Sequence, residues 1–501
     1  MKGRIWNRAT TADLNRYPPE AVFEAGERNH HVSNTSYPIA HSSVWKPYRV
    51  GRPLREQVVS RAFQGVDDLC LYVHIPFCEA RCSYCEYTVV GKHEMSETAA
   101  YMQRLSGEMA MYRDLLDTRR RTLHGFDIGG GTPSFVEAEL IAELLGNVRA
   151  SFRFGPSCGI SIETTPRIAA LEGRKLEAYA QAGVERISMG VQVIEPDLLR
   201  VLNRSGNGVE HHNRAVENIR RAGFAKFNLD LMYGFAGQSL ESWRATVEHA
   251  VSLGPEYITL YRMRYKLTRI SEQAPRVRLE AVHEQAALAK RLLADAGYQA
   301  NPGKNTYSRI EGDPGTSDYL TRRVVDGMPY LGLGLGAQTF THTTIGYNDG
   351  AAGKTLTPYA SSVEAGRLPI QDLYDLPLTH MMAKMAAVSF YFGQIDRASF
   401  HEKFGIALEE AFAEEVDFVL ERGLMRYTDR ALSLTAEGAR RFNGVIALFF
   451  APSVQAYLID RDPDRADDMT RNLAHCVECR TAGRDETGIR GNDWIRFRLQ
   501  C

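Results

Sequence analysis

The sequence predicts an α/β fold, an incomplete barrel of six β/α units with an N-terminal arm and a mostly helical, winged-helix-like C-terminal domain. Three observations predict it. Short apolar strands alternate with amphipathic segments between about residues 69 and 300, six such strands are visible where a full barrel has eight, and the pattern turns helical from about Leu376 onward. Repeated βα units imply a parallel sheet with helices outside it. We therefore expect the functional site at the carboxyl ends of the strands.

The first expected strand, Leu69–Ile75, is followed at once by three cysteines. The strand is a run of mostly branched apolar residues that Pro76 ends. Cys78, Cys82 and Cys85 then stand at x3 and x2 spacing. Thiolates are the usual ligands of iron–sulfur clusters, and a cubane held entirely by protein takes four of them. Three close thiolates predict a cluster with one iron left open; the alternative is a structural zinc knuckle that lacks one ligand.

The later strands carry polar residues near their carboxyl ends. Further strands are expected from residue 126 into a glycine turn at 129–131, and at 159–163, 185–192, 227–234 and 257–261. The glycines let a ligand approach backbone N–H groups closely. Glu163, Gln192 and Asp230 stand near the ends of three of these strands. Each alone is an ordinary polar strand end, but the ordered set predicts a binding site.

Composition and charge exclude several other classes. The chain has 501 residues, of which 44% are hydrophobic and 24% charged, as is ordinary for a globular protein of two or three domains. The net charge of −1 provides no basic field for nucleic acid. We expect no signal peptide and no membrane span, because the first residues are polar and the apolar run Val445–Val454 is short and contains Pro452. Eight cysteines in this length favour a reducing cytoplasm over a disulfide framework.

CxxxCxxC directly after Tyr-Val-His-Ile-Pro-Phe resembles the radical S-adenosylmethionine (SAM) superfamily and, within it, the HemN-like family. The glycine turn is similar to the family's GGGTP motif, and the resemblance runs from about residue 30 to 460. It implies a TIM-like barrel, a [4Fe–4S] cluster on the three cysteines and two SAM molecules. The positions that match family contacts to the cluster-bound SAM are Tyr72, Gly130, Gly131, Thr132, Glu163, Gln192, Arg204 and Asp230.

Three other segments are similar to the same family. Met328–Gln338 resembles the LGxGxxA segment that helps bind a second SAM, which assigns Ala337 and Gln338 to that site; a tight turn on the barrel rim is the alternative. Asn34–Pro38 resembles an arm that lies near the substrate entrance, with a surface-wrapping leader as the alternative. The C-terminal part resembles the HemN C-terminal domain, and the neutral charge favours a lid over DNA binding.

The expected parts are an arm with a short helix around 19–28 (residues 1–66), the partial barrel (67–300), a barrel extension with the second-SAM segment (301–375), the C-terminal domain (376–460) and a polar tail (461–501). In the tail, His475, Cys476 and Cys479 raise the alternative of a zinc or second cluster site, with Cys501 at the end of the chain. A lone CxxC is more often incidental.

Two departures from the family's dehydrogenases set the functional hypothesis. Those enzymes carry another cysteine two residues beyond the third ligand, where this chain has Tyr87, and Ser317–Thr321 lacks a glutamine that they use near the second SAM. The departures favour a HemN-like methyltransferase or cyclopropanase that transfers a methyl or methylene group to an sp2 carbon of a small conjugated, natural-product-type substrate. Oxidative decarboxylation of coproporphyrinogen III in heme biosynthesis and a HemW-like heme chaperone are the alternatives.

The candidates for proton transfer are Tyr87, Tyr261 and Tyr265, which follow the cysteine loop or the sixth strand; simple packing is the alternative for each. As partners we expect a small-molecule substrate and an electron donor such as flavodoxin or ferredoxin, with no nucleic acid and no membrane. The chain is expected to act as a monomer.

Overall fold

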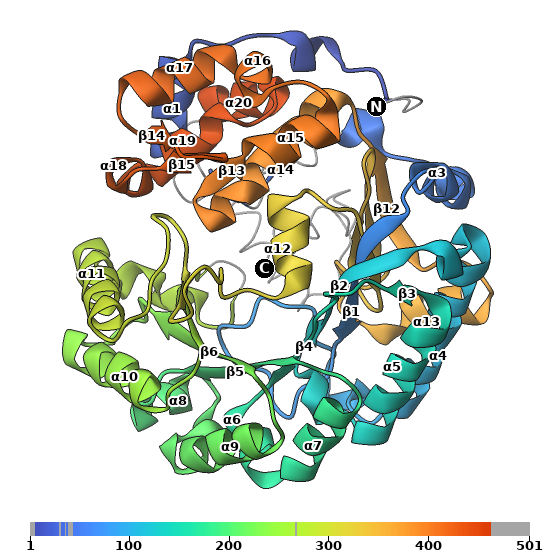
Figure 1. Ribbon diagram of the computed structural model, residues 1–501, viewed down its shortest axis with the longest axis vertical. Coiled ribbons are helices and arrows are strands. Elements are labelled where there is room, and N and C mark those ends of the chain that lie inside the picture. The colour runs from blue at the N-terminus through green and yellow to red at the C-terminus, as the bar shows by residue number, and fades with distance from the viewer. Residues whose placement is uncertain (1–5, 30–31, 36, 39–43, 266–267, 462–501) are drawn as a thin grey trace.

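Six parallel strands form the wall of an incomplete barrel, as expected (Figure 1). The structure is a computed structural model that describes residues 6–29, 32–35, 37–38, 44–265 and 268–461. The strands follow one another in the order β1 (Asp68–Ile75), β2 (Thr122–Gly130), β4 (Ile160–Thr164), β5 (Arg186–Gln192), β6 (Lys226–Tyr233) and β7 (Tyr257–Arg262).

The sheet continues on both sides of these six strands. On one side β9 (Tyr330–Leu333) pairs parallel with β1, and β10 (Gln338–Phe340), β11 (Thr344–Asn348) and β12 (Ile370–Asp375) follow it antiparallel. On the other side β8 (Thr306–Ser308) pairs antiparallel with β7. The short β3 (Arg153–Phe154) lies off this strand order and pairs parallel with β2. The glycine-rich segment at 328–338 therefore extends the barrel sheet next to β1, the strand that leads into the cysteine loop.

Amphipathic helices cover the outer face of the sheet (Figure 1). In α9, for example, His212, Ala215, Asn218 and Ile219 are buried at helical spacing. Side-chain caps begin several helices, as Ser239 does by accepting from the Ser242 N–H at the start of α10. The helices are α4 (Thr98–Leu116), α5 (Ala138–Ser151), α6 (Pro166–Leu171), α7 (Gly173–Gln181), α8 (Pro196–Val201), α9 (Val209–Arg221), α10 (Leu240–Ser252), α11 (Leu279–Asp295) and α13 (Leu356–Glu364).

The C-terminal region is mostly helical, as expected, and contains a three-stranded antiparallel sheet in the order β13-β15-β14. A hairpin that follows a helix is the arrangement of a winged helix. Between this region and the barrel lies α12 (Asp318–Val325) (Figure 1). The elements are α14 (Leu378–Ser389), β13 (Gln394–Asp396), α15 (Arg397–Phe404), α16 (Leu408–Ala411), α17 (Ala413–Glu421), β14 (Met425–Tyr427), β15 (Ala431–Leu434), α18 (Ala436–Arg440), α19 (Phe442–Leu448) and α20 (Pro452–Asp460).

The N-terminal arm packs on the C-terminal helices, so the two ends of the described chain share one apolar core. The expected short helix is α1 (Pro19–Arg28), which lies against α19. A Cβ on Gly26 would stand 2.5 Å from the Asn443 carbonyl oxygen, so only glycine allows this approach. A second helix, α3 (Arg55–Ala62), precedes β1.

Two predictions concern residues outside the described part. His475, Cys476, Cys479 and Cys501 of the tail lie there, as does Ser36 of the arm motif. Within the described residues, none of the helices is both long and apolar enough to cross a bilayer.

Candidate functional site

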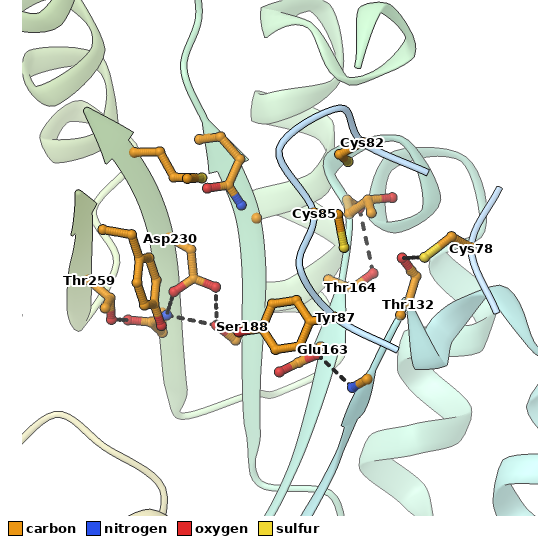
Figure 2. A pocket seen from close by; sticks show the side chains of 18 of the residues that line it. Cys78, Cys82, Cys85, Tyr87, Thr132, Glu163, Thr164, Ser188, Asp230 and Thr259 are labelled. Carbon is orange, nitrogen blue, oxygen red and sulfur yellow. Dashed lines mark hydrogen bonds between the residues drawn. The ribbon is translucent and has the colours of Figure 1, made fainter. Parts of the chain in front are cut away.

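A cavity of 530 Å³ opens at the carboxyl ends of the parallel strands and reaches into the barrel (Figure 2). Each of the six strands contributes lining side chains, and the cysteine loop between β1 and α4 forms another wall. The site therefore lies where the fold class predicts it. Its lining includes Tyr72, Asp127, Gly130, Gly131, Thr132, Glu163, Ser188, Gln192, Arg204, Asp230, Thr259 and Tyr261.

The three cysteines stand together on this cavity (Figure 2). Thr132 donates its hydroxyl to the Cys78 sulfur at 3.5 Å, and Arg204 Nη1 lies 3.2 Å from the Cys82 sulfur. A Cβ on Gly131 would come within 2.8 Å of the Cys78 sulfur and 2.5 Å of the Phe77 carbonyl oxygen. The glycine turn is thus needed for β2 to end against the cysteine loop.

The thiols are chemically suited to a cluster. Burial raises the pKa of Cys78 to about 12 and that of Cys85 to about 11, so a bound cation is needed to hold them as thiolates at neutral pH. Among the described residues, no three Cys, His, Asp or Glu side chains converge on a point that would suit a single metal ion. A cubane has its irons on separate corners, so its thiolates stand further apart. Three sulfur donors on a cavity fit a [4Fe–4S] cluster with an open iron.

Three carboxyl groups lie deeper in the cavity. Glu163 accepts from the Gly130 N–H at 3.2 Å, and Ser317 donates to Asp127 at 2.6 Å. Burial, with the neighbouring charges of Asp230 and Asp127, raises the pKa of Glu163 to about 8, and burial raises that of Asp127 to about 6. The pKa of Asp230 is also raised by burial. Burial and the two acidic neighbours thus disfavour the charged form of Glu163, and a positively charged ligand such as SAM would stabilise it.

A row of uncharged side chains fixes Asp230. Its oxygens accept from Ser188 at 3.1 Å and from Asn228 at 2.8 Å. Asn228 also donates to the Ser188 hydroxyl at 2.7 Å and accepts from Thr259 at 2.9 Å (Figure 2). Since these residues come from β5, β6 and β7, the row joins three strands and leaves the Asp230 carboxyl little freedom.

Gln192 and Arg204 also line the cavity. Gln192 has a positive φ of 67° at the end of β5, and its buried side-chain oxygen has no hydrogen-bond partner within the described residues. Such an atom is expected to bond to a ligand. Arg204 is buried and donates through Nη2 to the Gly190 carbonyl oxygen. Because its Nη1 also lies 3.2 Å from the Cys82 sulfur, Arg204 contacts the cysteine loop in addition to any carboxylate that it binds.

Tyr72 closes the cavity on the β1 side. Its hydroxyl lies 3.1 Å from His74 Nδ1, and its ring stacks on Tyr319 of α12 with centroids 5.7 Å apart. The eight side chains and glycines predicted to contact the first SAM therefore share one cavity. Their individual roles stay predictions.

The remaining predicted residues divide into two groups. Tyr87, which is 40% exposed, and Tyr261 line the cavity. Tyr265 does not: its hydroxyl donates to the Gly234 carbonyl at 3.2 Å and accepts from the Ala236 N–H at 2.7 Å. Ala337 and Gln338 are buried outside the lining, and Gln338 accepts from the Tyr330 hydroxyl. Their assignment to a second SAM also stays a prediction.

Some functional candidates were not recognised in the sequence. Asp127, Ser188 and Asn228 occupy inward positions of β2, β5 and β6. Polar residues two apart within otherwise apolar strands, as at 228 and 230, would have signalled them. Arg186 lies beside them and donates to the Gly315 carbonyl at 3.3 Å. Lys354, on a loop after β11, had no sequence signal.

Comparison with known proteins first gives the class. Residues 72–250 match the model described as the Radical SAM superfamily. The structure is similar to that of coproporphyrinogen III oxidase (HemN) from Escherichia coli, with a TM-score of 0.66 and 22% sequence identity over 78% of this chain and 93% of HemN. The protein is therefore a radical SAM enzyme with this barrel fold.

Individual relatives give the family. The chain is 30% identical over 319 residues to the oxygen-independent coproporphyrinogen III oxidase of Bradyrhizobium diazoefficiens, covering 61% of this chain and 69% of the relative. It is 28% identical over 437 residues to that of Cereibacter sphaeroides, covering 82% and 93%. The heme chaperone HemW of Haemophilus influenzae is 33% identical, but the match spans 46% of this chain and 61% of HemW.

The chain belongs to the HemN-like family of radical SAM proteins. Membership of this family confirms the expected [4Fe–4S] cluster and SAM as cofactors, whereas the second SAM molecule stays a prediction. Methyltransferase activity is not supported by these relatives, and the alternative of a coproporphyrinogen oxidase is supported better.

Proposed function

We propose that the protein oxidatively decarboxylates a carboxylate-bearing porphyrinogen of the coproporphyrinogen III class. The observation that carries the proposal is a set of partly exposed arginines that line the same cavity as the carboxyl groups that suit SAM. The relatives named for this reaction support it, since the match to one of them spans 82% of this chain.

The arginines are placed for substrate carboxylates. Arg262 ends β7, Arg264 follows it, and Arg167 lies in the first turn of α6; all three line the cavity. Arg167 pairs with Glu79, and Arg264 Nη2 stands 3.9 Å from a Glu86 oxygen. The Arg264 and Arg167 side chains are 51% and 41% exposed, so an incoming carboxylate can reach them. A guanidinium binds a carboxylate through two parallel hydrogen bonds.

The residues of the cavity position SAM and the substrate relative to each other. When bound, the cluster and SAM supply a carbon radical that removes one hydrogen atom from the substrate. Glu163 and Asp230 would hold the cationic and hydroxyl groups of SAM, and Gly130 and Gly131 let it lie against the end of β2. The arginines would fix a propionate side chain so that its β-carbon faces the reacting group. Loss of that hydrogen atom, of CO₂ and of one electron to an external one-electron acceptor leaves a vinyl group.

The methyl-transfer hypothesis also has one observation in its favour. Tyr87 lies on the cavity at the position where the family's dehydrogenases have an additional cysteine. None of the relatives described above is named as a methyltransferase. Methyl or methylene transfer to an sp2 carbon therefore stays a prediction, which the same experiment tests.

The experiment uses anaerobically reconstituted, reduced protein with SAM, coproporphyrinogen III and a one-electron acceptor. Mass spectrometry should show products that have lost one or both propionates as CO₂ with formation of vinyl groups. In Arg262→Ala/Arg264→Ala we expect KM for the substrate to rise roughly tenfold or more, about 1.4 kcal/mol or more of lost binding. The control is Arg200→Ala, an exposed arginine of α8 outside the cavity lining.

Other results would overturn the proposal. Substrate carrying an added methyl or methylene group would establish the methyl-transfer reading. A Soret band after addition of heme, without SAM cleavage under any of these conditions, would indicate a heme chaperone. An unchanged KM in the double arginine variant would remove the arginines from substrate binding.

A further inference from the structure

A buried lysine, Lys354, binds the end of the cysteine loop through two backbone carbonyl groups. Lys354 is 6% exposed. Its ammonium donates to the carbonyl oxygen of Glu86 at 3.0 Å and to that of Tyr87. These two residues directly follow Cys85, and a separation of 268 positions in sequence from Glu86 shows that the contact is a tertiary one.

One peptide unit links this lysine to a cysteine sulfur. The carbonyl group of Glu86 and the N–H group of Tyr87 belong to the same planar peptide. The carbonyl side accepts from Lys354, and the N–H side donates to the Cys85 sulfur, a hydrogen bond that opposes the rise in the Cys85 pKa caused mainly by burial. An ammonium on the carbonyl oxygen makes the peptide N–H a stronger donor, because hydrogen bonds in a chain polarise one another.

The surrounding loop is built to hold the lysine in place. Lys354 has a φ of 55°, which is uncommon for a residue with a side chain, and its N–H donates to the Gly350 carbonyl at 3.0 Å. The next helix, α13, is fixed at its start by Glu94, which accepts from the Leu356 N–H at 2.7 Å. Glu94 lies after the cysteine loop. Its hydrogen bond therefore gives the Lys354 loop a second connection to the segment that follows the cysteines.

We propose that Lys354 is a positioning residue that raises the reduction potential of the cluster through the Glu86–Tyr87 peptide. Hydrogen bonds to the sulfurs are among the factors that set cluster potentials, because they stabilise the more negative, reduced form. The cluster takes up one electron from an external one-electron donor, and no bond is made or broken in that step. Lys354 also holds Tyr87 where it faces the cavity.

The test is a reductive titration of the reconstituted full-length protein, followed by electron paramagnetic resonance with dithionite as the electron donor and no SAM present. Lys354→Met removes the charge and the donor, Lys354→Gln keeps an N–H donor without the charge, and Lys354→Arg keeps both. The matched control is Lys403→Met, another buried lysine that donates to a backbone carbonyl, that of Gly327. Iron content and thermal unfolding are measured for every variant.

The expected midpoint potential of Lys354→Met is more negative than that of the wild type, with Lys354→Gln between them and Lys354→Arg close to the wild type. Lys403→Met should not shift the potential. If Lys354→Met fails to retain iron, the midpoint potential of Lys354→Gln tests the proposal instead. A wild-type potential in a fully loaded Lys354→Gln and Lys354→Met, or an equal shift in Lys403→Met, would overturn the proposal. Because no substrate is used, this result is independent of the proposed reaction.

Discussion

Two enclosed acidic residues, Asp13 of the arm and Glu163 of the cavity, have opposite surroundings. Asp13 accepts from Thr10 at 2.7 Å and from His380 at 2.8 Å, and also from the hydroxyls of Tyr48 and Ser453. Burial alone would raise the pKa of Asp13, but its hydrogen bonds with His380, Ser453 and Tyr48 hold it well below its usual range. This acid has all its partners within the protein.

Glu163 has the reverse arrangement. Its described hydrogen bond comes from the Gly130 N–H, and its acidic neighbours Asp230 and Asp127 help burial to raise its pKa to about 8. The comparison teaches how to separate two kinds of buried polar cluster. A cluster whose donors and charges are balanced, as around Asp13, joins parts of the fold, whereas an unbalanced one, as around Glu163, is completed by a ligand.

The largest expected effect on activity comes from replacing the three cysteines of the cavity. Replacement of Cys78, Cys82 and Cys85 by alanine should remove the cluster and abolish SAM cleavage, because these are the thiolates on the cavity. Iron analysis, visible absorbance and 5′-deoxyadenosine formation check this. Cys158→Ala, a partly buried cysteine outside the cavity lining, should retain iron and activity. Iron retained by the triple variant would contradict the assignment.

The arm cluster should show its effect in stability instead. Asp13→Ala leaves buried donors on His380, Tyr48 and Ser453 without their acceptor, so we expect a loss of about 3 kcal/mol or more in the free energy of unfolding. Urea denaturation measures it. Because the folded pKa of Asp13 is lowered from 3.8, its contribution is complete above that pH and is lost as the pH falls further. SAM affinity should stay at the wild-type value. A loss of SAM affinity in the folded variant would contradict a purely structural role for the Asp13 cluster.

A smaller effect should appear in the pH dependence of SAM binding. Because the pKa of Glu163 is raised to about 8, its carboxyl group is mostly neutral at pH 6 to 7 in the free protein. The ionised form binds a cation better, so SAM affinity should increase as the pH rises from 6 toward 8, by at most tenfold per unit. In Glu163→Gln, equilibrium dialysis should give a weaker and flatter profile. A parallel profile in both proteins would show that another group is responsible.

The sequence predicted the cavity better than the contacts around it. The six strands, the helix at 19–28 and the site at the strand ends followed from local periodicity and from short motifs, whose residues are adjacent in the chain. The parallel pairing of β9 with β1 did not, because it joins segments about 260 residues apart. Arg204 was recognised as a binding residue, but its contact with Cys82 required the structure.

The contacts that sequence patterns missed share one physical feature. Asp13 with His380, and Lys354 with Glu86, are partners far apart in the chain, and each residue alone is an ordinary polar residue. No periodicity marks such pairs, since only the folded chain brings them together. The role of Ala337 and Gln338 likewise depends on where a second SAM lies, and their side chains are outside the cavity lining.

The origin of the hydrogen atom tests the account most directly. Reduced protein is incubated with SAM and coproporphyrinogen III deuterated at the propionate β-carbons, and 5′-deoxyadenosine is analysed by mass spectrometry. We expect deuterium from the labelled substrate to appear in 5′-deoxyadenosine. When unlabelled substrate is incubated with methyl-deuterated SAM instead, we expect no deuterium in 5′-deoxyadenosine. Deuterium from the SAM methyl group, or 5′-deoxyadenosine without label from either source, would contradict decarboxylation in this cavity.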